Sequence, residues 1–175
     1  MAGTPTTQRA PRRNPMTFPD RWDLTHLVSN PVTGIDAQLA DLESKVAKME
    51  AARSTLTPSM SSQDLLTLLH LSEEIAQGAS RLGAYAYLRF SENTKNADAR
   101  SLKTRVEEQL TGLTNRLLFF ELWWQGVNDV NASRLMADAG DLRYHLETIR
   151  RFKPHTLSEP EEKILNLKNV TGRSA

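Results

Sequence analysis

The spacing of apolar residues in the second half of the chain limits its possible folds more than any other feature. Between positions 96 and 125, large apolar residues follow one another at steps of three or four: Leu102, Val106, Leu110, Leu113, Leu117, Phe120 and Trp124. Such steps place side chains on one face of an α-helix, which turns once in about 3.6 residues. This segment is therefore predicted to be one long amphipathic helix.

The same spacing, interrupted by turn signals, predicts further helices over about 35–49, 62–90, 132–139 and 141–152. Thr33 and Asp36 resemble an N-terminal cap for the first of these. A final helix is expected to begin near Ser158, which has the spacing of a capping box with Glu161, and to end at Gly172. No stretch of the sequence alternates between apolar and polar residues in the way that predicts a β-strand. The predicted fold is all-α, an antiparallel bundle of about five or six helices.

Two of these helices are joined by a short polar turn, so they are expected to form a long antiparallel hairpin over about 62–125. In this hairpin the apolar segments LLTLLHL (65–71) and LLFFELWW (117–124) meet at the end away from the turn. Small residues at 76–86, Gly78 and Gly83 among them, are expected to let another helix approach closely.

The apolar end of the hairpin allows two interpretations. An arm that is anchored through Trp22, together with the helix at 141–152, is expected to cover part of it. An apolar patch that remains exposed is expected to be an interface, through which the chain self-associates. Its expected contact residues are Phe119, Phe120, Trp123 and Trp124. In the alternative, all four side chains are buried in the core of a single bundle.

Charge and composition exclude several classes of partner. The net charge is +1, from 22 basic and 21 acidic residues, which is too balanced for a nucleic-acid-binding protein. No apolar run is long enough for a transmembrane helix, and there is no cysteine. We therefore expect no nucleic-acid partner, no membrane partner and a cytoplasmic location. Residues 1–17, which contain prolines and lack helical periodicity, are predicted to be a disordered tail.

No residue pattern predicts chemistry within this chain. None of the four histidines begins an H-E-x-x-H motif, and His70 with Glu73 and Glu74 lacks a third metal ligand. There is no glycine-rich phosphate loop and no G-x-S-x-G elbow. We expect no catalytic residue, no metal ligand and no cofactor in this segment, so that the isolated chain binds no zinc and cleaves no peptide.

Five segments, in order, resemble the N-terminal region of oligoendopeptidase F, a family of zinc metallopeptidases related to thimet oligopeptidase. They are RWDLTHL (21–27), RLGAYAYLRFSENTKNADARSL (81–102), FFELWW (119–124), YHLETIRRFKPHTLSEPEEKIL (144–165) and NVTGRSA (169–175). The resemblance spans residues 18–175, and its most specific parts are Y-A-x-L at 85–88 and L-S-x-x-E-E at 157–162.

The resemblance implies that residues 18–175 are the N-terminal helical lobe of an enzyme that hydrolyses short peptides, where they form one wall of the substrate channel. In that family the H-E-x-x-H motif lies downstream of the matching region. The resemblance therefore implies that zinc and the catalytic domain belong to a part of the polypeptide that is absent from this chain. The alternative is a free-standing helical protein-interaction module that binds a partner through its apolar end.

Overall fold

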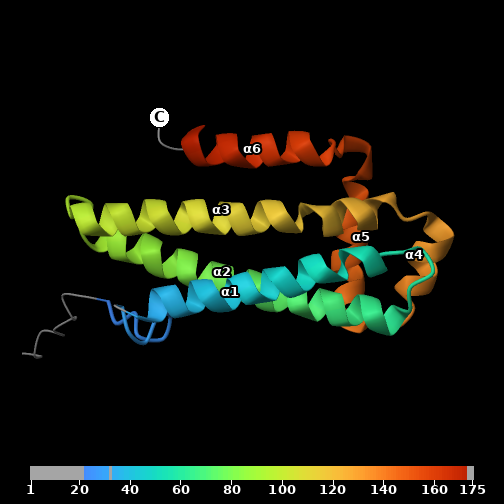
Figure 1. Ribbon diagram of the computed structural model, residues 1–175, viewed down its shortest axis with the longest axis horizontal. Coiled ribbons are helices and arrows are strands. Elements are labelled where there is room, and N and C mark those ends of the chain that lie inside the picture. The colour runs from blue at the N-terminus through green and yellow to red at the C-terminus, as the bar shows by residue number, and fades with distance from the viewer. Residues whose placement is uncertain (1–21, 32, 173–175) are drawn as a thin grey trace, which may run out of the picture.

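The computed structural model describes residues 22–31 and 33–172, and all regular structure within these ranges is helical (Figure 1). This confirms the predicted all-α fold. The predicted tail at 1–17 lies outside the described residues. The elements are, in order, α1 (Gly34–Ala51), η1 (Ala52–Thr55), α2 (Ser62–Glu92), α3 (Ala97–Gly126), α4 (Asp129–Leu135), η2 (Gly140–Leu142), α5 (Arg143–Arg151), η3 (Lys153–His155) and α6 (Glu159–Gly172).

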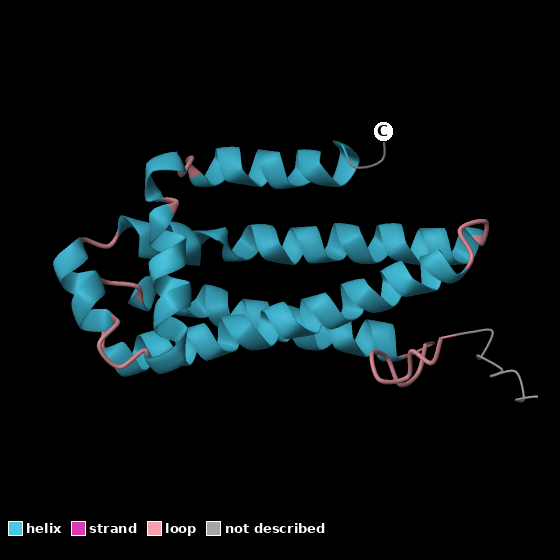
Figure 2. Ribbon diagram, turned by 180° about the vertical axis from the view of Figure 1, so that it is seen from behind, coloured by secondary structure: helices cyan, strands magenta, loops and turns pink. Residues whose placement is uncertain are grey.

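The three long helices α1, α2 and α3 pack together, and the shorter α4 and α5 lie at one end of them (Figure 1). Helix α6 returns along α3, on the opposite side of α3 from α2 in both views, and runs antiparallel to α3 (Figure 2). The predicted hairpin is α2 followed by α3. None of the described helices combines the length and the apolar character that crossing a membrane requires.

Side-chain caps explain where several helices begin. The Ser61 hydroxyl accepts a hydrogen bond from the Asp64 backbone N–H at 3.0 Å, and the Asn96 side chain accepts one from Ala99 at 3.1 Å. Helix α4 begins at Asp129, three residues before the predicted start, because the Asn128 side chain caps it through the Asn131 N–H at 2.9 Å. The predicted cap at Thr33 is wrong, since its side chain makes no capping hydrogen bond.

The arm before α1 is anchored by a different residue from the one predicted. The Trp22 side chain is 55% exposed, whereas Val28 is only 2% exposed. The Val28 backbone N–H donates to the Leu24 carbonyl at 3.2 Å, so the chain makes a turn here, and Leu24 and Leu27 pack partly buried against the core. The expectation for Trp22 is wrong because this residue precedes the turn that directs Val28 inward.

Close packing against α2 occurs at the small residues, as predicted. A Cβ atom at Gly78 would lie 2.8 Å from Leu42 Cδ2 of α1, and one at Gly83 would lie 3.5 Å from Leu110 Cδ1 of α3. Leu42 is itself buried, at 1% exposure, so it has little room to move aside. Gly78 therefore sets how closely α1 approaches α2.

Alanine substitution of two helical glycines tests this packing. Gly112 lies inside α3, and a Cβ atom added there would meet nothing within 4 Å, so Gly112→Ala should raise the free energy of unfolding by about 1 kcal/mol through helix propensity alone. Gly78→Ala gains the same helix propensity, but its new methyl group crowds Leu42. The increase in the free energy of unfolding should therefore be cancelled or turned into a decrease. Urea unfolding monitored by circular dichroism measures both. Equal stabilisation by the two substitutions would contradict the close approach of α1.

Candidate interaction surface

The described part of the chain holds no group of three or more His, Cys, Asp or Glu side chains that could bind a metal ion. The pair predicted from sequence does form, since His70 Nδ1 lies 3.2 Å from Glu73 Oε2, but both side chains are on the exposed side of α2. Two exposed groups on one helix do not make a zinc site, which requires three or four ligands.

The apolar end of the hairpin is closed by the chain itself. Phe119 and Phe120 are each 4% exposed and Trp124 is fully buried, while Trp123 is partly buried. Leu146 of α5, also fully buried, covers this end as predicted for the helix at 141–152. Phe119, Phe120 and Trp124 are therefore buried, as the core alternative expects, and Trp123 is the only one of the four that is partly exposed.

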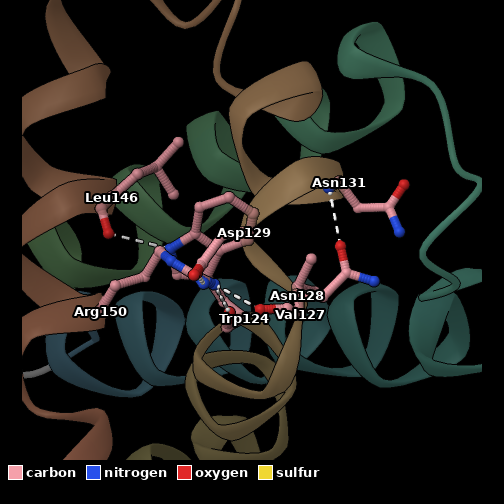
Figure 3. A network of polar contacts seen from close by, with 7 residues as sticks. All are labelled: Trp124, Val127, Asn128, Asp129, Asn131, Leu146 and Arg150. Carbon is pink, nitrogen blue, oxygen red and sulfur yellow. Dashed lines mark hydrogen bonds and ion pairs between the residues drawn. The ribbon is translucent and has the colours of Figure 1, made fainter.

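Polar contacts fasten α5 over this aromatic end (Figure 3). The indole N–H of Trp124 donates to the Leu146 carbonyl at 2.9 Å. The Arg150 guanidinium donates to the carbonyls of Trp124 and Val127 at 2.9 and 2.8 Å and pairs with the Asp129 carboxylate at 2.6 Å. The last carbonyls of a helix lack partners within it, and a cation at that end is favoured electrostatically. Arg150 thus caps α3 and ties it to α4.

Removal of this cap should destabilise the whole bundle. Arg150→Ala should lower the free energy of unfolding by about 1.5–3 kcal/mol, because carbonyls beside the buried indole lose a charged donor. Arg151→Ala is the matched control, since Arg151 is exposed and should change stability by less than about 0.5 kcal/mol. Chemical denaturation of the two variants compares them directly. Equal effects would show that the Arg150 contacts contribute no net stability.

A shallow pocket of about 440 Å³ lies where η1, α3 and the start of α6 meet. Its lining residues are Arg53, Leu56, Phe119, Leu122, Trp123 and Glu159. The Arg53 guanidinium lies 4.8 Å from the centre of the Phe119 ring and 2.9 Å from the Glu159 carboxylate. Its two charged residues are thus already paired with each other. The pocket suits an apolar side chain of a neighbouring segment better than a reacting substrate.

Helix α6 packs on the bundle with its polar side. Its partly buried residues recur at helical spacing and form what we call the inner face: Glu159, Glu162, Lys163 and Asn166. The Asn166 amide donates to the Asn115 side chain of α3 at 2.9 Å, and Glu159 pairs with Arg53 of η1. Within α6, Lys163 lies 2.7 Å from Glu159. Polar and charged contacts, rather than an apolar seam, therefore hold α6 in place.

The apolar residues of α6 point outward as a result. Ile164 is 64% exposed, Leu165 44% and Leu167 56%, and these three residues define the outer face of α6. An ordinary surface helix has the opposite arrangement, with its apolar stripe turned to the core. Sequence spacing does not show which stripe of α6 faces the bundle, because its apolar and polar residues both recur at helical spacing.

Exposed apolar side chains are concentrated in the last third of the described chain. The described residues include nine large hydrophobic side chains that are exposed, and seven of them lie beyond position 127: Val130, Tyr144, Phe152, Leu157, Ile164, Leu165 and Leu167. The other two, Trp22 and Tyr87, lie on the arm and on α2. Contiguous exposed apolar surface on a protein normally marks an interaction site. The outer face of α6, with its three neighbouring residues, is the clearest candidate for one.

The stability that the ionised Glu159 carboxylate contributes to the fold should depend on pH. The hydrogen bond from Lys163, with a smaller contribution from Arg53, holds the pKa of the Glu159 carboxyl below its ordinary value of 4.5. A lowered pKa in the folded state means that ionised Glu159 stabilises the fold above pH 4.5, and that this contribution is lost as the pH falls through the lowered pKa.

Glu159→Gln should therefore lower the free energy of unfolding at pH 7 by less than about 1 kcal/mol, because the ion pairs are partly exposed. The difference between wild type and variant should vanish in acid. Urea unfolding of both proteins at several pH values measures it. A difference that stays constant down to pH ~3 would contradict the assignment.

The segment that carries most of the exposed apolar side chains also resembles a known protein family. Residues 127–175 match the N-terminal family model described as Oligopeptidase F. The matched segment begins just after α3 and includes α4, α5 and α6. It supports an N-terminal region of the oligoendopeptidase F family, and so confirms the predicted resemblance for the part of it that lies at residues 127–175. No curated protein and no solved structure matches the chain.

Proposed function

We propose that this chain is the N-terminal helical lobe of an oligoendopeptidase F-like zinc metalloendopeptidase, in which it forms one wall of the channel that admits short peptides. The observation that carries the proposal is the match of residues 127–175 to the family model. Exposed apolar side chains cluster in the same segment. A lobe that packs against another part of an enzyme needs an apolar contact surface of this kind.

In this proposal the outer face of α6 docks the lobe onto the catalytic part of the polypeptide. The bundle of α1, α2 and α3 gives the wall its stiffness, since its core side chains are closely packed and α5 closes its end. The lobe would limit access by size and would take no chemical step.

The described residues do not fit a zinc site. Their His, Cys, Asp and Glu side chains form no group of three that could hold an ion, and His70 with Glu73 supplies two exposed groups only. In the proposed enzyme, zinc is held by residues outside this lobe, where it would activate the attacking water. The short peptide is the substrate of the whole enzyme.

The alternative, a free-standing interaction module, was predicted to bind its partner through the apolar end of the hairpin. At that end Phe119, Phe120 and Trp124 are buried, and α5 covers Trp124. The apolar surface left at that end is Trp123, which is only partly buried, and the pocket that it lines with Leu122.

A peptidase assay tests the proposal on the polypeptide that joins this segment to an H-E-x-x-H motif. Ile164→Glu with Leu167→Glu places charges on the outer face of α6 and should loosen the lobe. Cleavage of long fluorogenic peptides should then rise several-fold relative to short ones, because the channel loses a wall. Tyr87→Glu, a substitution of an equally exposed apolar residue on α2, is the matched control.

Chelation of zinc should abolish turnover in all of these proteins. The proposal fails if the reading frame that contains this segment encodes no H-E-x-x-H motif. It also fails if the α6 variant keeps the length preference of the wild type.

A further inference from the structure

We propose that the exposed side of α5 binds a short acidic segment of another polypeptide, and that Arg151, stacked on the ring of Tyr144, receives its carboxylate. We call this side the basic face and define it by Tyr144, Arg151, Phe152 and Lys153. It is separate from the outer face of α6, which the proposed function assigns to the catalytic part of the polypeptide. The inference does not rest on that function, because it concerns only residues of α5 and η3.

The basic face is turned away from the bundle. Leu146, on the opposite side of α5, is fully buried, whereas Tyr144 is 68% exposed and Phe152 is 60% exposed. Arg151 and Lys153 are exposed as well. Tyr144 and Arg151 are seven residues apart, about two turns of helix, so their side chains lie on one side of α5. In Figure 2, α5 crosses in front of the long helices at one end of the bundle. The face is therefore open to a partner.

Arg151 is positioned by the ring of Tyr144 and still has donors to offer. Its guanidinium lies 5.8 Å from the centre of the Tyr144 ring. Stacking occupies the flat side of a guanidinium and leaves the N–H groups at its edge, which can bind a carboxylate through two parallel hydrogen bonds. Among the described residues no carboxylate pairs with Arg151, whereas the adjacent Arg150 is paired with Asp129. The stack is thus a prepared carboxylate-binding group without a carboxylate.

Phe152 and Lys153 extend the same chemistry beyond the stack. Lys153, at the start of η3, is likewise paired with no carboxylate in the described part of the chain. The exposed ring of Phe152 lies between the two cations in sequence. Alternate side chains of an extended peptide point to the same side. A peptide that presents an acidic, an apolar and a second acidic side chain on one side therefore complements this face in charge and in polarity.

A short peptide fits the basic face better than a broad polyanion does. The face extends about 12 Å along α5 from Tyr144 to Phe152. Helix α6 begins beside the end of α5, and its first turn carries Glu159, Glu161 and Glu162 (Figure 2). A lipid surface or a nucleic-acid strand would extend over these acids and be repelled by them. The net charge of +1 provides no general attraction that would offset this repulsion.

Fluorescence anisotropy of a labelled, end-blocked peptide, ESLSE, tests the binding, since its two glutamates and its leucine share one side when it is extended. The 175-residue chain should bind it with a dissociation constant of about 0.1–1 mM, because the contacts are few and exposed. Added salt should weaken the binding. The matched peptide QSLSQ, which lacks the carboxylates, should bind at least about tenfold more weakly.

Substitutions test the role of the stack. Arg151→Ala should raise the dissociation constant of ESLSE about tenfold, and Arg151→Lys should recover only part of the affinity, because lysine keeps the charge but not the planar fork. Tyr144→Leu should weaken binding several-fold. The double variant should bind no more weakly than Arg151→Ala, since the ring acts through the guanidinium. Arg81→Ala and Tyr87→Leu, substitutions of exposed residues on α2, are the matched controls and should bind as wild type does.

Sedimentation with vesicles of equal parts phosphatidylcholine and phosphatidylserine tests the membrane alternative, and the chain should remain in the supernatant. Circular dichroism should show the same helix content in every variant, because each substituted residue is exposed. The inference is overturned if the chain does not bind ESLSE, if QSLSQ binds equally well, or if the chain sediments with the vesicles. It is also overturned if Arg81→Ala weakens binding as much as Arg151→Ala, or if the effects of Tyr144→Leu and Arg151→Ala add. These results say nothing about zinc-dependent cleavage by the larger polypeptide, so the two proposals fail separately.

Discussion

The close contact of α1 with α2 at Gly78 is the constraint on which the rest of the bundle depends. With no side chain at Gly78, Leu42 can pack directly against the backbone of α2. This approach lets α1 lie against both members of the hairpin, so that Val46, Leu65, Leu82 and Val106 all become fully buried. A core assembled from three long helices in this way needs no contribution from α6, which explains how α6 can pack with its polar side.

At the C-terminal end of α3, one short helix, α5, stabilises both the helix terminus and the aromatic core beside it. The apolar end of α3 would expose both its aromatic side chains and its last carbonyl groups. The Leu146 carbonyl accepts the hydrogen bond of the Trp124 indole, and Arg150, one turn further along α5, supplies donors to the carbonyls. The same short helix therefore satisfies both requirements, and it leaves the aromatic cluster internal.

Much of the fold and little of the interaction surface followed from sequence. The helices α2 and α3 were predicted within about two residues, because long amphipathic stripes and the Ser61 and Asn96 positions mark them clearly. The start of α4 was misplaced, since Asn128 stands both after one helix and before the next. The sequence predicts Trp22 as the anchor of the arm, but Val28 has that role, and only the turn at Leu24 decides between them.

The sequence by itself determined the helical period, the order of the elements, the long hairpin and the resemblance to the oligoendopeptidase F N-terminal region. These depend on local spacing and on segment order. Only the tertiary structure decided which face of each helix is covered. For Trp124 the cover is α5, a segment more than twenty residues away in sequence from the tryptophan that it binds, and for Phe119 it is Arg53 of η1. For α6 the neighbour is the polar side of α3, so Ile164, Leu165 and Leu167 face solvent. Periodicity defines stripes on a helix, but burial depends on what packs against each stripe.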